Sequence, residues 1–188
     1  MPVDPQSIAV LIPAHNEEGA IGQTIIDIKK LLPEARVVVC DNHSTDLTAV
    51  EAKEAGAQVI TEKRKGKGNA VRRLLTSVQA EIYILVDGDN TYDLTHLLDA
   101  LEFFHRNSMD LMTGNRLLSL TTHMRAGHGF GNTLFTKSLR LFLDVQTQDV
   151  FSGLRIMSRR LIRSFPLVST EFEIETELSI FAARMRLP

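Results

Sequence analysis

The stretch EIYILVDGDN, residues 81–90, joins a run of apolar residues to two closely spaced carboxylates. Residues 82–86 are apolar throughout, which is typical of a strand buried on both faces of a parallel sheet. Asp87 and Asp89 follow with only Gly88 between them, so their charges repel each other unless a cation lies between them. The stretch therefore predicts a buried strand that ends in an acidic loop, although Asp and Gly are also common in solvated turns.

Around this stretch, short apolar segments alternate with segments whose apolar residues recur at helical spacing. The expected strands cover residues 7–13, 35–40, 57–61, 81–86, 110–114 and 153–158. The expected helices cover residues 21–32, 44–56, 70–78, 94–104, 134–142, 158–164 and 171–185. This alternation predicts an α/β fold, with a mostly parallel central sheet flanked by helices on both faces.

In such a sheet, right-handed crossovers place the carboxyl ends of the strands at one edge, where ligands bind. Polar residues follow four of the expected strands directly. They are His15, Asn16 and Glu17, then Asp41 and Asn42, then Asp87 and Asp89, then Asn115 and Arg116. We expect all of them at the same edge of the sheet.

Composition places limits on the kind of protein. A length of 188 residues fits one domain, and a formal net charge of -2 gives no overall field that would favour nucleic acid. Cys40 is the single cysteine, which excludes an internal disulfide and favours a reducing, cytoplasmic compartment. We also expect no signal peptide and no membrane-spanning helix, because no apolar run of about 18 residues occurs.

The pair Asp87 and Asp89 offers only oxygen ligands, which suits Mg²⁺ or Mn²⁺ completed by water and substrate phosphates. Zinc would favour a cluster of His and Cys, and the sequence has no tight cluster of this kind. A metal held by one or two carboxylates plus phosphate is the usual arrangement for a nucleotide. The pair alone is compatible with a nucleotide-binding metal site and with a solvated turn, and the neighbouring segments favour the metal site.

A basic segment, KRKGKGNAV at residues 63–71, precedes one of the expected helices. Its glycines allow the backbone to approach a ligand, while Lys65, Lys67 and the helix amino terminus favour an anion. The spacing is not that of a Walker motif, and no GxGxxG follows the first strand. An exposed basic turn is the alternative.

The segment CDNHSTDLT, residues 40–48, follows the second expected strand. Asp41 could accept a hydrogen bond from a base N–H or a ribose hydroxyl. Asp46 is expected in the first turn of a helix that starts near Ser44 or Thr45, where it would act as a cap. For Asp46 the structural role is preferred over ligand contact.

Six motifs occur in a fixed order between residue 11 and about residue 155, and a seventh lies at residues 172–178. They read LIPAHNEEGAI, DNHSTDLT, KGKGNAVR, DGDNTYD, TGNR, FSGLR and FEIETEL. Together they resemble family 2 glycosyltransferases with the GT-A fold, and in particular the branch that transfers sugars to dolichyl and polyprenyl phosphates. The resemblance implies one catalytic domain over 1–188, with a nucleotide-binding part at about 1–115 and an acceptor-side part at 116–188.

The resemblance also implies roles for individual residues. Pro13, Ala14, Asn16 and Glu17 would contact the nucleotide, Asp41 the base, and Lys65 and Lys67 the base or diphosphate. Asp87 and Asp89 match the metal-binding DXD pair, with Asp89 as the better ligand and Asp87 close to the ribose or metal. Thr91 stands where some relatives have a glutamine ligand. Arg116, Arg125 and Asn132 would engage the acceptor phosphate.

The implied reaction is an inverting transfer from a UDP- or GDP-sugar. A lipid-phosphate acceptor is already ionised near neutral pH, so Arg116 and Arg125 would position it without a strong general base. A hydroxyl acceptor would need such a base, for which Asp149 and Glu173 are candidates, although acidic residues near a helix start also stabilise the helix dipole. Relatives usually continue beyond this length and often carry membrane helices, which leaves open a truncated carboxyl end and membrane association at the cytoplasmic face.

Two other functions remain open on the sequence. A sugar-phosphate nucleotidyltransferase shares the sheet and the acidic pair, but it normally has a glycine-rich loop after the first strand, where this chain has PAHNEEGAI. Release of pyrophosphate would identify that enzyme. A non-catalytic nucleotide-binding domain would bind the ligand without transferring a sugar.

Overall fold

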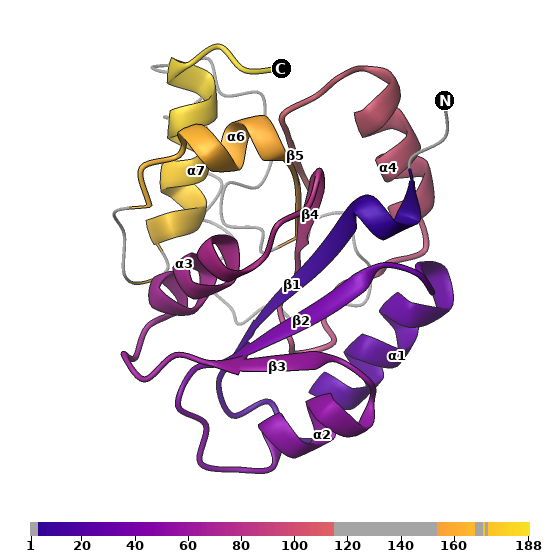
Figure 1. Cartoon of the computed structure of the whole chain (residues 1–188), viewed down its shortest axis with the longest axis vertical. Coiled ribbons are helices and arrows are strands. Elements are labelled where there is room, and N and C mark those ends of the chain that lie inside the picture. Colours follow the sequence, from indigo (N-terminus) through magenta and orange to yellow (C-terminus); the bar gives the residue numbers. More distant parts are fainter. Residues whose placement is uncertain (1–3, 115–153, 168–170, 172) are drawn as a thin grey trace, which may run out of the picture.

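The computed structural model describes residues 4–114, 154–167, 171 and 173–188, and its central feature is a six-stranded sheet (Figure 1). The strands are β1 (Ile8–Ala14), β2 (Arg36–Asp41), β3 (Gln58–Thr61), β4 (Ile82–Leu85), β5 (Leu111–Thr113) and β6 (Arg155–Ser158). Their order in the sheet is β3-β2-β1-β4-β6-β5. The mostly parallel sheet expected from the sequence is confirmed, because β1 pairs in parallel with β2 and β4, and β2 with β3.

Strand β6 runs against its neighbours, and the sequence pattern did not indicate this reversal. It lies between β4 and β5 and is antiparallel to both, with Arg155 opposite Leu85 on one side and Thr113 on the other. Arg155, the first residue of β6, therefore lies at the edge where the other five strands have their carboxyl ends. Both flanking strands thus still end at that edge, as expected.

The described helices are α1 (Ile21–Leu31), α2 (Thr48–Glu54), α3 (Lys67–Ser77), α4 (Leu97–Arg106), α6 (Arg159–Ser164) and α7 (Glu173–Arg184), and a short 3₁₀ turn spans Pro5–Ser7. Helix α2 begins at Thr48 rather than near Ser44 or Thr45, because the residues before it hydrogen-bond to the loop after β1. Helix α3 begins earlier than expected, directly after Gly66, whose φ of 119° favours glycine. The helix expected at 134–142 lies outside the described residues.

Helices cover both faces of the sheet (Figure 1). Alternate residues of β1 enter two separate cores: Val10 and Ile12 pack with residues of α1 and α4, whereas Leu11 packs with residues of α3 and α7. Burying a Leu or Ile side chain fully contributes about 1.5–3 kcal/mol each. The uniformly apolar strands are thus explained by burial on both sides.

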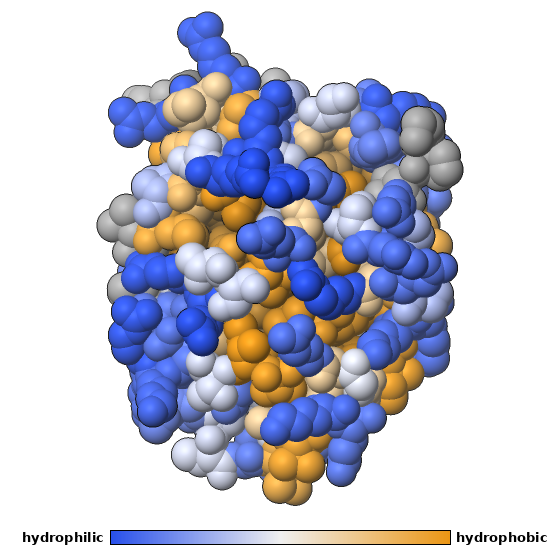
Figure 2. Space-filling model, viewed as in Figure 1, coloured by the Kyte–Doolittle hydropathy of each residue, from blue (hydrophilic) through white to orange (hydrophobic). Residues whose placement is uncertain are grey.

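The surface of the molecule carries both hydrophilic and hydrophobic residues. Seen from the side of Figure 1, a band of hydrophobic residues crosses the middle of the molecule between hydrophilic borders (Figure 2). Large hydrophobic side chains that are exposed in the described ranges include Leu47, Val50 and Phe103. Among the helices that the structure describes, none is both long and apolar enough to cross a membrane.

Candidate functional site

The loops that follow β1 and β2 are joined side by side at the carboxyl edge of the sheet. Asn16, in the left-handed region with φ of 56°, donates its backbone N–H to Ser44 Oγ at 3.0 Å. Its side-chain Oδ1 accepts the backbone N–H of Thr45 at 2.9 Å. The backbone N–H of Glu17 donates to Thr48 Oγ1 at 2.8 Å. Asn16 therefore fixes the conformation of the predicted nucleotide-binding loop, and its contact with a nucleotide stays a prediction.

Asp46 links the same two loops. Its Oδ1 accepts the Thr48 backbone N–H at 3.0 Å and the Thr48 hydroxyl at 2.5 Å, and its Oδ2 accepts the Glu18 backbone N–H at 3.2 Å. The carboxylate thus satisfies a backbone donor at the start of α2. Asp46 thus has a structural function, but it lies before α2 and not in its first turn as expected, since the helix begins only at Thr48.

Three other predicted nucleotide contacts lie at the ends of β1 and β2. Pro13 and Ala14 are buried within β1, and the Ala14 carbonyl accepts the backbone N–H of Asn42 at 2.8 Å. Asp41 is half-buried at the end of β2, where its Oδ1 accepts the Ser44 backbone N–H at 3.2 Å. The structure thus places Asp41 at the expected edge, with Pro13 and Ala14 inside the strand rather than in a loop.

The buried side chain of Asn42 holds the basic loop in place. Its Nδ2 donates to the carbonyls of Glu62 and Arg64 at 3.1 and 2.7 Å, and its Oδ1 accepts the backbone N–H of Gly66 at 2.9 Å. Lys65 lies next to this loop anchor with its side chain exposed. The sequence predicts Asn42 at the ligand edge but not its anchoring function, for which an amide directly after a buried strand was the available signal.

Asn42→Ala is expected to lower the free energy of unfolding by about 1–3 kcal/mol, because it leaves a buried N–H and two carbonyls without their partner. Urea unfolding followed by circular dichroism measures this change. Asn107→Ala is the matched control, since exposed Asn107 makes a single side-chain hydrogen bond to the Phe103 carbonyl at 2.8 Å. Equal losses in the two variants would contradict the anchoring role.

Lys67, the first residue of α3, lies between two carboxylates from distant parts of the chain. Its Nζ is 2.6 Å from Asp87 Oδ1 and also forms an ion pair with Glu175 of α7. Burial would lower the pKa of Lys67, but the two carboxylates raise it well above its usual range. The two basic residues predicted near the diphosphate thus differ: Lys65 is exposed, whereas Lys67 is a mostly buried ammonium that neutralises acidic groups.

Asp89 is oriented by its own loop. Its Oδ1 accepts the Thr91 hydroxyl at 2.7 Å and the Thr91 backbone N–H at 3.2 Å. Within the described residues, both of these hydrogen bonds to the Asp89 carboxylate are accepted by Oδ1. Its Oδ2 is therefore the oxygen left for a ligand. Thr91, at the position of a possible third ligand, therefore holds Asp89 instead.

The carboxyl group of Glu17 lies close to this acidic loop, whose negative charge changes the pKa of Glu17. Burial, and after it the carboxylates of Asp89, Asp87 and Asp46, together raise the pKa of Glu17 to about 7 against the opposing charge of Lys67. The positive charge of Lys67 thus offsets only part of the negative charge of these carboxylates. A divalent cation fits such a place, because carboxylate oxygens are the ligands that Mg²⁺ and Mn²⁺ prefer.

No group of three or more His, Cys, Asp or Glu residues suited to a metal ion occurs in the described part of the chain. Asp87 and Asp89 would therefore bind a cation as a pair, with substrate oxygens as the remaining ligands. Glu17, Lys67, Asp87 and Asp89 are brought together as predicted. Arg116, Arg125, Asn132 and Asp149 lie outside the described residues.

Gly88 allows this acidic loop to lie close to α1. A Cβ at Gly88 would lie 2.9 Å from Ile21 Cδ1 and 3.5 Å from Glu17 Cγ. The Gly88 carbonyl accepts the Thr24 hydroxyl at 3.2 Å. Close packing against Ile21 thus explains why a glycine stands between the two aspartates.

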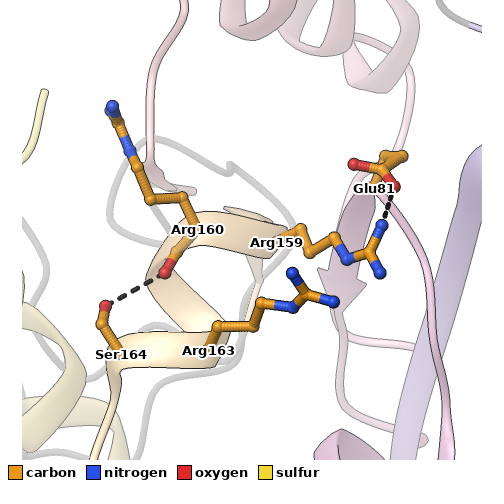
Figure 3. Close-up of a pocket in the computed structure, with 5 residues that line it drawn as sticks. All are labelled: Glu81, Arg159, Arg160, Arg163 and Ser164. Carbon is orange, nitrogen blue, oxygen red and sulfur yellow. Dashed lines mark hydrogen bonds and ion pairs between the residues drawn. The ribbon is translucent and has the colours of Figure 1, made fainter.

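A pocket of about 500 Å³ lies at the opposite edge of the sheet, lined by Glu81, Arg159, Arg160, Arg163 and Ser164 (Figure 3). Arg159 forms an ion pair with Glu81, just before β4, and Arg160 forms one with buried Asp110, just before β5. These arginines tie α6 to the amino ends of two strands. The pocket is therefore remote from the acidic loop, and Arg159 and Arg160 have a structural function there.

The chain is similar to several known proteins, among them two whose names state that they transfer sugars. It is 46% identical to Protein RfbJ of Shigella flexneri over 110 residues, covering 58% of this chain and 85% of that protein. It is 31% identical to Glycosyltransferase AglJ of Haloferax volcanii over 185 residues, covering 96% of this chain and 59% of that protein. A dolichyl-phosphate hexose transferase of the same organism is 28% identical over 155 residues, covering 82% and 68% of the two chains.

Among solved structures, glucosyl-3-phosphoglycerate synthase of Mycobacterium tuberculosis in complex with Mn²⁺, UDP and phosphoglyceric acid matches with a TM-score of 0.77 and 26% identity. The match covers 95% of this chain and 64% of that one, so the chain spans about three fifths of the length of AglJ and of this structure. The likeness confirms the GT-A fold that the resemblance implied. The profile described as Glycosyl transferase family 2 matches residues 9–165. The chain therefore belongs to glycosyl transferase family 2.

Proposed function

We propose that the chain transfers a sugar from a nucleoside diphosphate sugar to an acceptor, with Mg²⁺ or Mn²⁺ as cofactor. The observation that carries this proposal is the cluster of Glu17, Asp87, Asp89 and Lys67 at the carboxyl edge of the sheet. It combines a surplus of carboxylates with a fixed ammonium, which suits a cation and a diphosphate bound together.

In this proposal each residue has a task in holding the donor. Asp89 presents its Oδ2 to the cation while Thr91 fixes Oδ1, and Asp87 lies close to the ribose or the cation. Lys67 and exposed Lys65 meet diphosphate oxygens, and Asp41 accepts a hydrogen bond from the base or ribose. The cation supplies charge neutralisation for the departing nucleoside diphosphate.

A UDP-sugar is the preferred donor, and a GDP-sugar is the alternative. Solved mycobacterial relatives hold Mn²⁺ with UDP or with UDP-glucose, at 26% identity to this chain. This supports a uridine nucleotide and a divalent metal in the same family fold. The base itself would be recognised near Asp41, whose carboxylate accepts the Ser44 backbone N–H through Oδ1.

For the acceptor we propose a polyprenyl or dolichyl phosphate and an inverting attack. The similarity to a dolichyl-phosphate hexose transferase supports this class of acceptor. The acceptor phosphate is already ionised near neutral pH, so cationic residues suffice to position it, and Arg116 and Arg125 are assigned that task. Asp149 would act as general base only for a hydroxyl acceptor. A lipid acceptor would bring the protein to the cytoplasmic face of a membrane.

A ligand panel tests the donor. UDP-glucose, UDP-N-acetylglucosamine and GDP-mannose are each added with and without Mn²⁺, and the thermal unfolding midpoint is measured. One donor is expected to raise the midpoint only with Mn²⁺, since a ligand at about 100 times its Kd adds about 2.7 kcal/mol of stability. No Mn²⁺-dependent shift with any donor would contradict the proposal.

The reaction is then tested with the stabilising donor, polyprenyl phosphate and the full-length protein. We expect a glycosylated lipid phosphate and free nucleoside diphosphate. Release of pyrophosphate would instead identify a nucleotidyltransferase, and binding without transfer in the presence of membranes would identify a non-catalytic domain.

A further inference from the structure

Helix α7 contributes a buried carboxylate to the acidic site from the far end of the chain. Glu175 is 3% exposed, and its side chain forms an ion pair with Lys67, from which it is separated by 108 residues. The Glu175 carbonyl accepts the Ser179 hydroxyl at 3.1 Å, and Ser179 Oγ accepts Arg155 Nη1 at 2.9 Å. A continuous polar chain thus runs from the acidic loop through α3 to α7 and β6.

Glu175 differs from its neighbours on the same helix. Glu173 is exposed, as expected for an acidic residue that only stabilises the start of a helix. Burial raises the pKa of Glu175, and the ammonium of Lys67 opposes this change. A buried carboxylate destabilises the fold unless it is paired, and Lys67 supplies this pairing for Glu175. The helix dipole alone does not explain why an acidic residue is buried at this position.

Lys67 lies where its ammonium interacts with two carboxylates at once. Its Nζ lies 2.6 Å from Asp87 Oδ1 while it also contacts Glu175. The ammonium therefore contacts two carboxylates, of which only Asp87 belongs to the metal-binding pair, while the guanidinium of buried Arg155 also attracts Glu175. Glu175, the second carboxylate, competes with Asp87 for the ammonium of Lys67.

We propose that Glu175 is a positioning residue that acts through Lys67: it holds the ammonium between two carboxylates, so that Asp87 keeps enough negative charge to take part in cation binding. This inference rests on the proposed function. It adds that the acceptor-side helix α7 sets the cation affinity of the donor-side loop. A cation at Asp87 would repel Lys67 toward Glu175 and so tighten the pairing of α3 with α7.

The first test compares two substitutions that remove the same charge from α7. Glu175→Gln leaves Lys67 to pair with Asp87 alone, so the affinity for Mn²⁺ is expected to fall on the order of tenfold. Glu173→Gln, on the exposed face, is expected to change it less than about twofold, as is usual for a surface charge. Mn²⁺ binding to the full chain is measured by electron paramagnetic resonance, with and without UDP. Glu175→Asp, which keeps the charge, is expected to restore most of the affinity.

The second test uses the unaltered chain and does not depend on the folding of a variant. Amide hydrogen exchange in the first two turns of α7 is measured with Mg²⁺ and UDP and without them, and exchange is expected to slow when both are bound. Equal Mn²⁺ affinity in Glu175→Gln and Glu173→Gln, or unchanged exchange in α7, would overturn this inference alone, provided that the unaltered chain binds Mn²⁺ and UDP. Absence of that binding would overturn the proposed function as well.

Discussion

Replacing Asp89 with alanine is expected to abolish Mn²⁺-dependent binding of the sugar nucleotide and to lower turnover on the order of 10²- to 10³-fold. The reason is that the proposed function assigns cation binding to Asp89, whose Oδ1 is held by Thr91, and a bound cation contributes several kcal/mol to charge stabilisation during the reaction. Asp89 is half-buried in a loop after β4, so its removal is expected to leave the fold intact. Isothermal titration with UDP, with and without Mn²⁺, measures the loss.

Two further variants separate charge from loop shape. Asp89→Asn keeps an oxygen that can accept from Thr91 but removes the charge, so it is expected to lose Mn²⁺-dependent binding as well. Asp99→Ala removes a carboxylate whose side chain is 85% exposed on α4, and it is expected to bind normally. Mn²⁺-dependent affinity that survives in Asp89→Ala would refute the metal assignment.

The second large effect is expected from Gly88→Ala. The added methyl group would lie 2.9 Å from Ile21 Cδ1, and Ile21 is completely buried with little room to move aside, so we expect the acidic loop to shift. A displacement of about 1 Å at reacting groups can lower turnover on the order of 10²-fold, and overpacking of this kind costs about 1–3 kcal/mol of stability. Steady-state kinetics and urea unfolding measure the two effects.

A double variant shows whether the contact with Ile21 is the cause. Ile21→Val removes the Cδ1 atom, so combining it with Gly88→Ala is expected to recover much of the lost activity. Gly22→Ala is the matched control, because a Cβ there meets nothing within 4 Å and alanine favours the helix by about 0.5–1 kcal/mol. If the double variant is no more active than Gly88→Ala, the steric explanation fails.

Much of the fold follows from local patterns. Apolar strands such as Ile82–Leu85 and amphipathic helices such as α1 are recognisable because burial on two faces or on one face dictates their residue types. The direction of β6 was not indicated, because its residues, RIMS, read the same in either direction of pairing. Antiparallel pairing depends on where the preceding chain returns to the sheet, and no local pattern records this.

The candidate site was predictable where residues directly follow a strand, as for Asp87, Asp89 and Glu17. It was not predictable where a side chain arrives from another part of the chain. Glu175 looked like one of several acids at a helix start, yet it is buried, where it pairs with Lys67 and is attracted by buried Arg155. Such partners are fixed by the packing of α7 against α3, which periodicity within each helix does not specify.

The most direct measurement is anomalous diffraction from crystals of the protein soaked with Mn²⁺ and UDP. We expect a manganese peak bound by Asp89 and by diphosphate oxygens, with Lys67 close to the same diphosphate. UDP bound elsewhere, or bound at the carboxyl edge with no manganese and with Asp89 turned toward solvent, would contradict this expectation.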